Sequence, residues 1–150
     1  MKKKIVLGDI FEIETKKGKG FMQYVKEPKN NTRLEKVRIF YDLHKDAPKE
    51  LSTIVGKDSF YLSFPIKSAL NKNILKYVGN VPLPLDFIFP KYFRTENIFG
   101  SGWSIINIEG GQSTVEELSD KEIMMSPWGT WNDTLLIDNL EKGWRLENWK

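Results

Sequence analysis

Apolar and polar residues alternate along several short stretches of the chain, and a period of two residues is the pattern of a β-strand with one buried face. We expect strands near residues 4–14, 21–25, 37–41, 60–66, 74–78 and 103–108. The Lys- and Gly-rich residues 16–20 predict a hairpin loop between the first two strands, and the polar residues 27–35 predict another loop. Because consecutive strands are joined by short turns, the pattern favours antiparallel pairing.

Helix signals concentrate late in the sequence. Two pairs fit a capping box, in which a Ser or Thr precedes a Glu by three residues: Thr114 with Glu117, and Ser119 with Glu122. The clearest helix begins after the N-cap Asn132 and ends before Gly143, which occupies the C′ position that glycine favours. Leu136 and Leu140 share one face of this helix.

These elements predict an α+β fold. We expect a strongly twisted, mainly antiparallel sheet, or a partly closed barrel, of about six strands, with short helices late in the chain including a C-terminal helix. The length of 150 residues and the apolar content of 40% fit one domain over residues 1–150 with one sound core.

The segment from Val78 to Arg94 interrupts this alternation with prolines. Proline lacks the backbone donor that a central strand needs, so Pro82, Pro84 and Pro90 predict a connection rather than a strand. The segment is too apolar for a solvated linker, and its large side chains are expected to be buried: Phe87, Ile88, Phe89, Tyr92 and Phe93. A rigid apolar connection without catalytic groups suggests support for a binding surface.

Composition narrows the classes of protein that remain. The chain has no cysteine, which excludes disulfides, zinc–thiolate sites and thiol catalysis. The apolar run after the N-terminal lysines is too short for a signal peptide, and no run is long enough to span a membrane, so we expect a cytoplasmic protein. Basic residues are in excess over residues 1–75 and acidic residues over 76–150. Lysines at chain ends and loop tips explain the basic half, so we disfavour nucleic acid as a partner.

Few residues offer catalytic chemistry, and we expect neither enzymatic activity nor a cofactor or metal site. His44 is the only histidine, and we expect it at the surface because it lies in a polar strand exit. The Gly100-Ser101-Gly102 sequence lacks the spacing of a nucleophile elbow. A hydrolase that uses carboxylates stays open as an alternative, and it would need an acid with a raised pKa in a cleft.

Two tryptophans late in the chain are candidates for partner binding. Trp128 and Trp131 lie in a segment with Pro127 and Gly129, where loop tryptophans either anchor an interface or pack into the core. Four acidic residues precede them and are expected to form a charged rim: Glu116, Glu117, Asp120 and Glu122. The alternative role of these carboxylates is to cap a helix.

Four residues are expected to serve the fold rather than function: Gly8, Asp9, Gly79 and Asn80. Glycine permits a positive φ or a close approach at a turn or bulge. Asp9 lies on an otherwise apolar strand face, where its carboxylate can accept hydrogen bonds from exposed backbone. Arg94 could pair with an acidic group such as Asp9 or Asp86.

Three motifs follow one another along the chain: Gly8-Asp9-Ile10-Phe11-x-Ile13; Val78-Gly79-Asn80-x-Pro82-x-Pro84 with Pro90-x-x-x-Arg94; and Trp131-Asn132-x-x-Leu135-Leu136 with Gly143. The ordered set resembles the immunity protein 26 family of bacterial polymorphic toxin systems, and it spans nearly the whole chain.

The resemblance implies a cytoplasmic immunity protein that binds and neutralises a cognate toxin domain by direct protein contact. It implies no catalytic residue. From the residues themselves we expect the toxin to contact Trp128 and Trp131 within the acidic rim. The alternative is a β domain that binds a small ligand or nucleic acid through the basic first half of the chain.

Overall fold

The computed structural model describes residues 4–28 and 34–150. These residues form nine strands: β1 (Asp9–Thr15), β2 (Gly18–Lys26), β3 (Glu35–Phe40), β4 (Ser59–Phe64), β5 (Leu75–Asn80), β6 (Tyr92–Glu96), β7 (Trp103–Asn107), β8 (Gln112–Val115) and β9 (Ser126–Pro127). They also form the helices α1 (Ser52–Val55), α2 (Ile66–Asn71), α3 (Asp120–Ile123) and α4 (Asp133–Glu141), and the 3-10 helix η1 (Leu146–Asn148). The predicted α+β class is confirmed.

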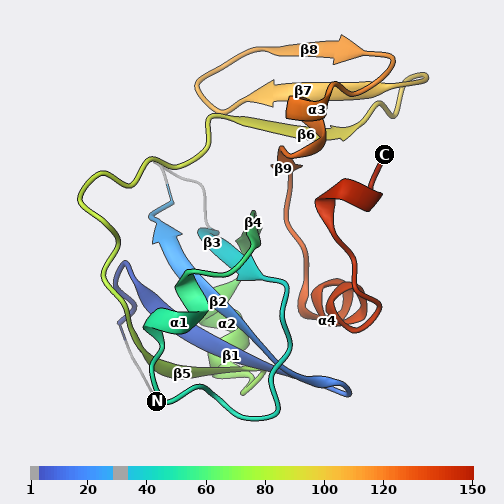
Figure 1. Cartoon of the computed structure of the whole chain (residues 1–150). Helices are drawn as coiled ribbons and strands as arrows, with labels where there is room; N and C mark the ends of the chain where they lie inside the picture. Colours follow the sequence, from blue (N-terminus) through green and yellow to red (C-terminus); the bar gives the residue numbers. More distant parts are fainter. Residues whose placement is uncertain (1–3, 29–33) are drawn as a thin grey trace.

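The strands divide between two sheets (Figure 1). The first sheet contains β4-β3-β2-β1-β5, and its neighbouring strands are antiparallel. The second contains β8-β7-β6-β9, in which the β6–β9 pair is parallel and the other pairs are antiparallel. Both sheets are open, so the expected single sheet or partly closed barrel of about six strands is replaced by five strands plus four.

Strands β6, β8 and β9 were not predicted, because their residues lack the apolar alternation of a strand. Strand β6 lies at the end of the proline-rich segment and pairs with β7. Strand β8 is polar, and its Thr114 pairs with Ser104, so the capping box expected at Thr114 is wrong. The second capping box is confirmed: Ser119 and Glu122 exchange both hydrogen bonds at the start of α3.

Helices α1 and α2 correct the expectation that helices occur only late. Helix α2 follows β4 directly and buries Ile66, Ala69 and Leu70 at helical spacing. Helix α1 is a single turn that buries Ile54. Both are too short for their periodicity to stand out in the sequence. In residues 4–28 and 34–150, no helix is both long and apolar enough to cross a membrane.

Both faces of the five-stranded sheet carry packed side chains. One face forms the larger core with α2, α4 and η1, to which each contributes a buried leucine: Leu70, Leu136 and Leu146. On the opposite face of the sheet, Ile10, Phe21 and Phe40 pack against Ile54 of α1. Alternation along the strands sends successive side chains to the two faces.

Helix α4 begins and ends where the sequence predicts. The side-chain oxygen of Asn132 accepts a hydrogen bond from the N–H of Leu135 at 2.8 Å. Gly143 follows the helix with a φ of 73°, the left-handed conformation of a C′ glycine. Leu136 and Leu140 are buried, so the predicted apolar face is the one that packs on the sheet.

Candidate functional site

The first and middle sequence motifs meet where β1 begins and β5 ends. Gly8 has a φ of +94°, and its carbonyl accepts a hydrogen bond from the N–H of Val81 at 3.0 Å. A Cβ atom at Gly8 would lie 2.6 Å from the carbonyl oxygen of Val81, so only glycine fits. The buried carboxylate of Asp9 accepts hydrogen bonds from the N–H of Val6 and the side-chain amide of Asn80, at 2.8 and 2.9 Å.

A β-bulge lies beside this junction. Ile10 pairs with Gly79, whereas the next residue, Phe11, pairs with Tyr77, so β5 carries one extra residue. A Cβ atom at Gly79 would lie 2.4 Å from the side chain of Leu51. Phe11 is fully buried in the larger core, and its ring meets Tyr77 edge to face. These motif residues therefore join β1 to β5.

Arg94 is fully buried and bonds to backbone carbonyls, not to Asp9 or Asp86. Its guanidinium donates to four carbonyl oxygens: Ile123 at 2.8 Å, Leu146 at 2.9 Å, Met125 at 3.2 Å, and Trp149. It also lies over the rings of Trp103 and Trp149, at 4.8 and 4.2 Å from their centroids. Burial lowers the pKa of Arg94 to about 10, so the side chain is a cation at neutral pH and ties β6 to the C-terminal segment.

The proline-rich residues 81–91 form the connection between β5 and β6, and they run along one side of the molecule (Figure 1). The expectation that all large side chains of this segment are buried is wrong for two of them, since Ile88 is 85% and Tyr92 45% exposed. Leu85, at the turn of the loop, is fully exposed. Ile88 stands between Phe87 and Phe89, which turn toward the sheet, and alternation in an extended segment then directs Ile88 outward.

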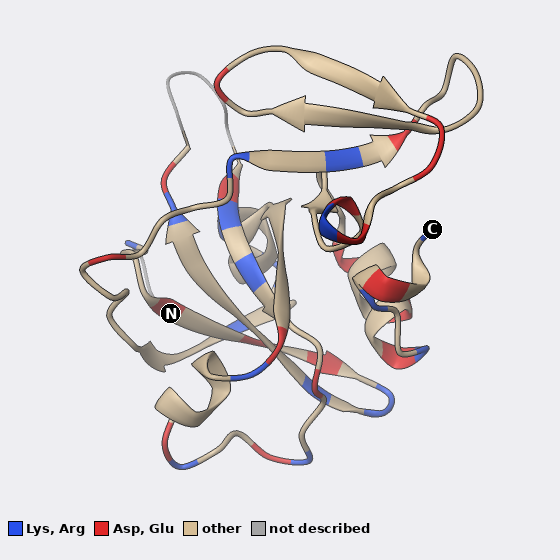
Figure 2. Ribbon diagram, turned by 45° about the horizontal axis from the view of Figure 1, so that its top comes forward, with Lys and Arg blue, Asp and Glu red and all other residues tan. Residues whose placement is uncertain are grey.

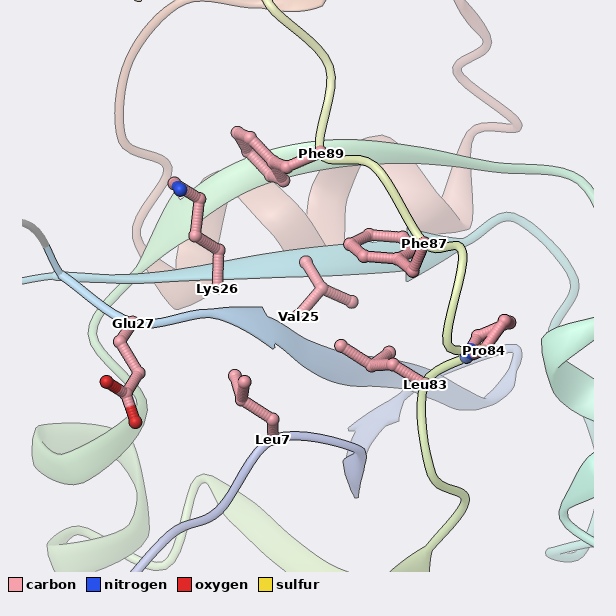
Figure 3. Close-up of a pocket in the computed structure, with 8 residues that line it drawn as sticks. All are labelled: Leu7, Val25, Lys26, Glu27, Leu83, Pro84, Phe87 and Phe89. Atoms are coloured by element: carbon pink, nitrogen blue, oxygen red, sulfur yellow. The ribbon is translucent and has the colours of Figure 1, made fainter.

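An open pocket of about 480 Å³ lies between this loop and the end of β2 (Figure 3). Six of the eight residues that line it have apolar side chains, although the surface facing the pocket is more polar than apolar: Leu7, Val25, Lys26, Glu27, Leu83, Pro84, Phe87 and Phe89. Lys26 and Glu27 lie at one end of the pocket, and Leu83 and Pro84 at the other. Pro82 and Pro84 are both exposed, and Pro84 also lines the pocket.

Four aromatic rings continue from this pocket across to the second sheet. Tyr61 of β4 contacts Phe89 of the loop, with ring centroids 5.4 Å apart. Phe89 contacts Phe93 of β6 at 5.7 Å, and Phe93 contacts Trp128 at 6.0 Å. We call Tyr61, Phe89, Phe93 and Trp128 the aromatic strip. It draws on β4, the proline-rich loop, β6 and the residue after β9.

Two lysines lie over rings of the aromatic strip. The Nζ of Lys26 is 5.7 Å from the Phe89 centroid, and the Nζ of Lys36 is 5.5 Å from the Trp128 centroid. Lys36 also donates a hydrogen bond to the hydroxyl of Ser63 at 2.6 Å. Burial, with a smaller effect of the neighbouring Lys26 charge, lowers the pKa of Lys36. Among the ion pairs of residues 4–28 and 34–150, none includes either lysine.

The two tryptophans proposed as anchors lie in different surroundings. Trp128 is 43% exposed at the end of the aromatic strip. Trp131 is half-buried and packs against the larger core, with its ring 5.3 Å from Phe60 and 5.0 Å from Trp144. Trp128 therefore offers the more accessible ring, and Trp131 has the core-packing role that the sequence left as its alternative.

Two of the four predicted rim carboxylates accept local hydrogen bonds. Glu122 caps α3, and Glu116 accepts a hydrogen bond from the hydroxyl of Ser101 at 2.8 Å. Glu117 and Asp120 are exposed. Figure 2 shows acidic residues on the segment that leads into α3 and along α4. In the described part of the chain, no hydrogen bond or ion pair joins these carboxylates to either tryptophan, and the charged neighbour of Trp128 is a lysine.

The sequence analysis did not identify Lys26, Lys36 and Phe89 as members of one surface. The alternation in β3 carried part of the signal, because Lys36 and Arg38 must face away from the core residues Val37 and Ile39. The position of Phe89 beside this face depends on the path of a long loop, and no local pattern indicates it.

Comparison with known proteins adds no relative: no family model matches the sequence, and neither a curated protein nor a solved structure shows significant similarity to it. The resemblance to the immunity protein 26 family therefore rests on the quoted motifs alone. The function of the chain has to be inferred from those motifs and from its own surface.

Proposed function

We propose that this chain is a protein-binding domain of the immunity type, which neutralises a toxin domain by covering part of its surface. The observation that carries the proposal is the ordered proline-rich loop, which holds Leu85 and Ile88 out in solvent. Exposed apolar side chains add nothing to the stability of the isolated chain, and where they gather they mark contact sites for other molecules.

The residues around this loop also support a protein-binding surface. The same loop contributes Leu83, Pro84, Phe87 and Phe89 to the pocket, and Phe89 also belongs to the aromatic strip that ends at Trp128. Aromatic anchors beside apolar pockets are the usual centres of protein interfaces. Neutralisation by contact also needs slow dissociation, which a well-packed apolar centre provides.

The motif resemblance supports a toxin domain as the partner. The residues that carry its first two motifs join β1 to β5, directly before the proline-rich loop. They hold the start of the loop in place, so a role in the fold is compatible with a role in positioning the binding surface. In this proposal the chain transforms no substrate.

A toxin-protection assay tests the proposal. The chain is expressed together with the small C-terminal domain of a large secreted protein encoded directly upstream of it, and survival of the host is measured along with co-purification. Wild type is expected to protect and to co-purify. A protein that neither protects against nor binds this domain would contradict the proposal.

The contribution of the loop is tested by replacing Leu85 and Ile88 together with Asp. Both side chains are exposed, so the fold is expected to be retained while binding falls by about a hundred-fold, as for hot-spot residues of an interface. Ile98→Asp with Phe99→Asp is a matched control at an equally exposed apolar turn, 83% and 93% exposed. If only the control pair abolishes protection, the interface lies on the β6–β7 turn and not on this loop.

A further inference from the structure

We propose that the aromatic strip, together with Lys26 and Lys36, binds an acidic segment of the partner that also presents apolar side chains. This inference rests on the proposed function, because it takes the partner to be a protein. It differs from the sequence expectation, in which the chain itself supplied an acidic rim around Trp128 and Trp131.

The charges of this surface favour an acidic occupant. Lys26 and Lys36 lie over two rings of one strip, Phe89 and Trp128, and neither lysine has a carboxylate partner among the ion pairs of the described residues. Arg38 lies on the same face of β3 as Lys36 and bonds to the hydroxyl of Ser59, a neutral group. Glu27 lines the adjoining pocket without forming an ion pair with either lysine. A carboxylate from outside would relieve the repulsion between the ammonium groups.

Most lysines of the described residues form no ion pair, so what sets Lys26 and Lys36 apart is their position over rings of one strip. Lys19, Lys91, Lys142 and Arg145 each meet a carboxylate of this chain within 3.6 Å. The lysines over the aromatic strip are instead held against rings and, for Lys36, against a serine hydroxyl. Their charge is therefore positioned but not neutralised, which is the arrangement expected of groups that meet their counter-charge in a complex.

The apolar part of the surface favours a protein segment over nucleic acid. Bases bind open aromatic faces by stacking, but lysine ammonium groups already cover faces of Phe89 and Trp128. Ile88, which precedes Phe89 in the sequence, and Leu85 of the same loop are exposed, and such side chains suit aliphatic or aromatic partners but offer phosphate no hydrogen bond. The pocket of about 480 Å³ is also large enough to receive a side chain.

The test is a selection of displayed random peptides on the immobilised full chain, with counter-selection on the Lys26→Glu/Lys36→Glu variant. Enriched peptides are expected to combine Asp or Glu with large apolar residues. Their affinity is then measured for the wild type, the charge-reversed variant, and a milder Lys26→Gln/Lys36→Met variant that keeps apolar stems and removes both charges. We expect a loss of about ten-fold or more in both variants, and weaker binding by the wild type as salt is added.

The matched control is Lys45→Glu/Lys49→Glu, which makes the same charge change at two exposed lysines of the β3–α1 connection. It should bind the selected peptides as the wild type does. Circular dichroism and thermal unfolding check the fold of every variant. If charge reversal disrupts the fold, the milder variant decides the outcome.

Several results would overturn the inference. They are the enrichment of no peptide, the enrichment of neutral or basic peptides, or equal binding by the wild type and the folded lysine variants. Tight, salt-sensitive binding of a single-stranded oligonucleotide that the lysine variants lose would assign the surface to nucleic acid instead. The toxin-protection assay is read separately: protection by the wild type with failure of the peptide test rejects this surface and leaves the proposed function standing.

Discussion

At the residue scale, Arg94 shows how backbone carbonyls can hold a buried charge, since no ion pair among residues 4–28 and 34–150 includes it. Four backbone carbonyls accept hydrogen bonds from its guanidinium, and two tryptophan rings enclose it. Arg94→Met would leave those carbonyls without their donor, so we expect the free energy of unfolding to fall by about 3–5 kcal/mol. Arg94→Lys keeps the charge but has fewer donors, so its free energy of unfolding should lie between those of the wild type and Arg94→Met. Urea denaturation measures both, and a loss under about 1 kcal/mol for Arg94→Met would contradict this role.

Tyr24 gives the chain a predictable alkaline transition. Burial, with smaller effects of Glu27 and Glu35, raises the pKa of Tyr24 from 10.0 to about 12. The folded state therefore holds the phenol proton more tightly than the unfolded state. The contribution of protonated Tyr24 to the free energy of unfolding is complete below pH 10 and is lost as the pH rises toward 12. We expect Tyr24→Phe to remove about 2–3 kcal/mol of this pH dependence. Urea denaturation of the wild type and of Tyr24→Phe at pH 9 and pH 12 measures this difference. If both proteins lose the same free energy of unfolding between the two pH values, the pH dependence does not come from Tyr24.

At the element scale, local pattern predicted the strands whose side chains alternate and failed for those held by pairing alone. Strand β3 has apolar Val37 and Ile39 between charged neighbours, and it was predicted. Strand β8 has no such alternation, and it exists because Thr114 and its neighbours pair with β7. A single-turn helix such as α1 is fixed by the burial of Ile54, which no short-range signal reveals.

The same distinction applies to the candidate site. The sequence marked Trp128 and the proline-rich segment as candidates for binding, and both belong to the candidate surface that the structure suggests. It did not place Lys36 against Trp128, because Lys36 lies in β3 of the first sheet, Trp128 follows β9 of the second, and the two meet only in the tertiary fold. It also offered carboxylates as partners for Arg94, whereas the acceptors are carbonyls remote in sequence, which carry no residue-type signal at all.

The junction of β1 and β5 is the element that sets the start of the proline-rich loop, and Gly8 is its most constrained point. An alanine there would need both a left-handed φ and a displacement of the Val81 carbonyl. We expect Gly8→Ala to lower the free energy of unfolding by about 2–3 kcal/mol. Gly56→Ala is the matched control, since Gly56 has a φ of −84° and a Cβ there would meet no atom nearer than 4.0 Å. Equal stability of the two variants would show that the junction tolerates alanine.

At the scale of the whole molecule, the candidate surface depends on how the two sheets are joined. The N–H of Tyr61 donates to the hydroxyl of Ser126 at 2.9 Å, and the N–H of Ser63 donates to the carbonyl of Gly129 at 3.2 Å. These bonds cover the edge of β4 and hold Trp128 over Lys36. A partner that contacts the aromatic strip would therefore touch both sheets at once, and loosening the second sheet would weaken binding without any change to a contact residue.

Trp149 provides the means to test this dependence. Its carbonyl accepts a hydrogen bond from Arg94, and its ring meets Trp103 edge to face at 5.0 Å, so it braces β6 and β7 from the side remote from the strip. We expect Trp149→Ala to reduce hydrogen-exchange protection in β6 and β7 by about ten-fold or more while β1 to β3 keep theirs. Leu135→Ala, at an exposed position of α4, is the control that should leave both sheets protected. Equal loss of protection in the two sheets would mean that they open as one cooperative unit, and partner binding would then follow global stability instead of the position of the second sheet.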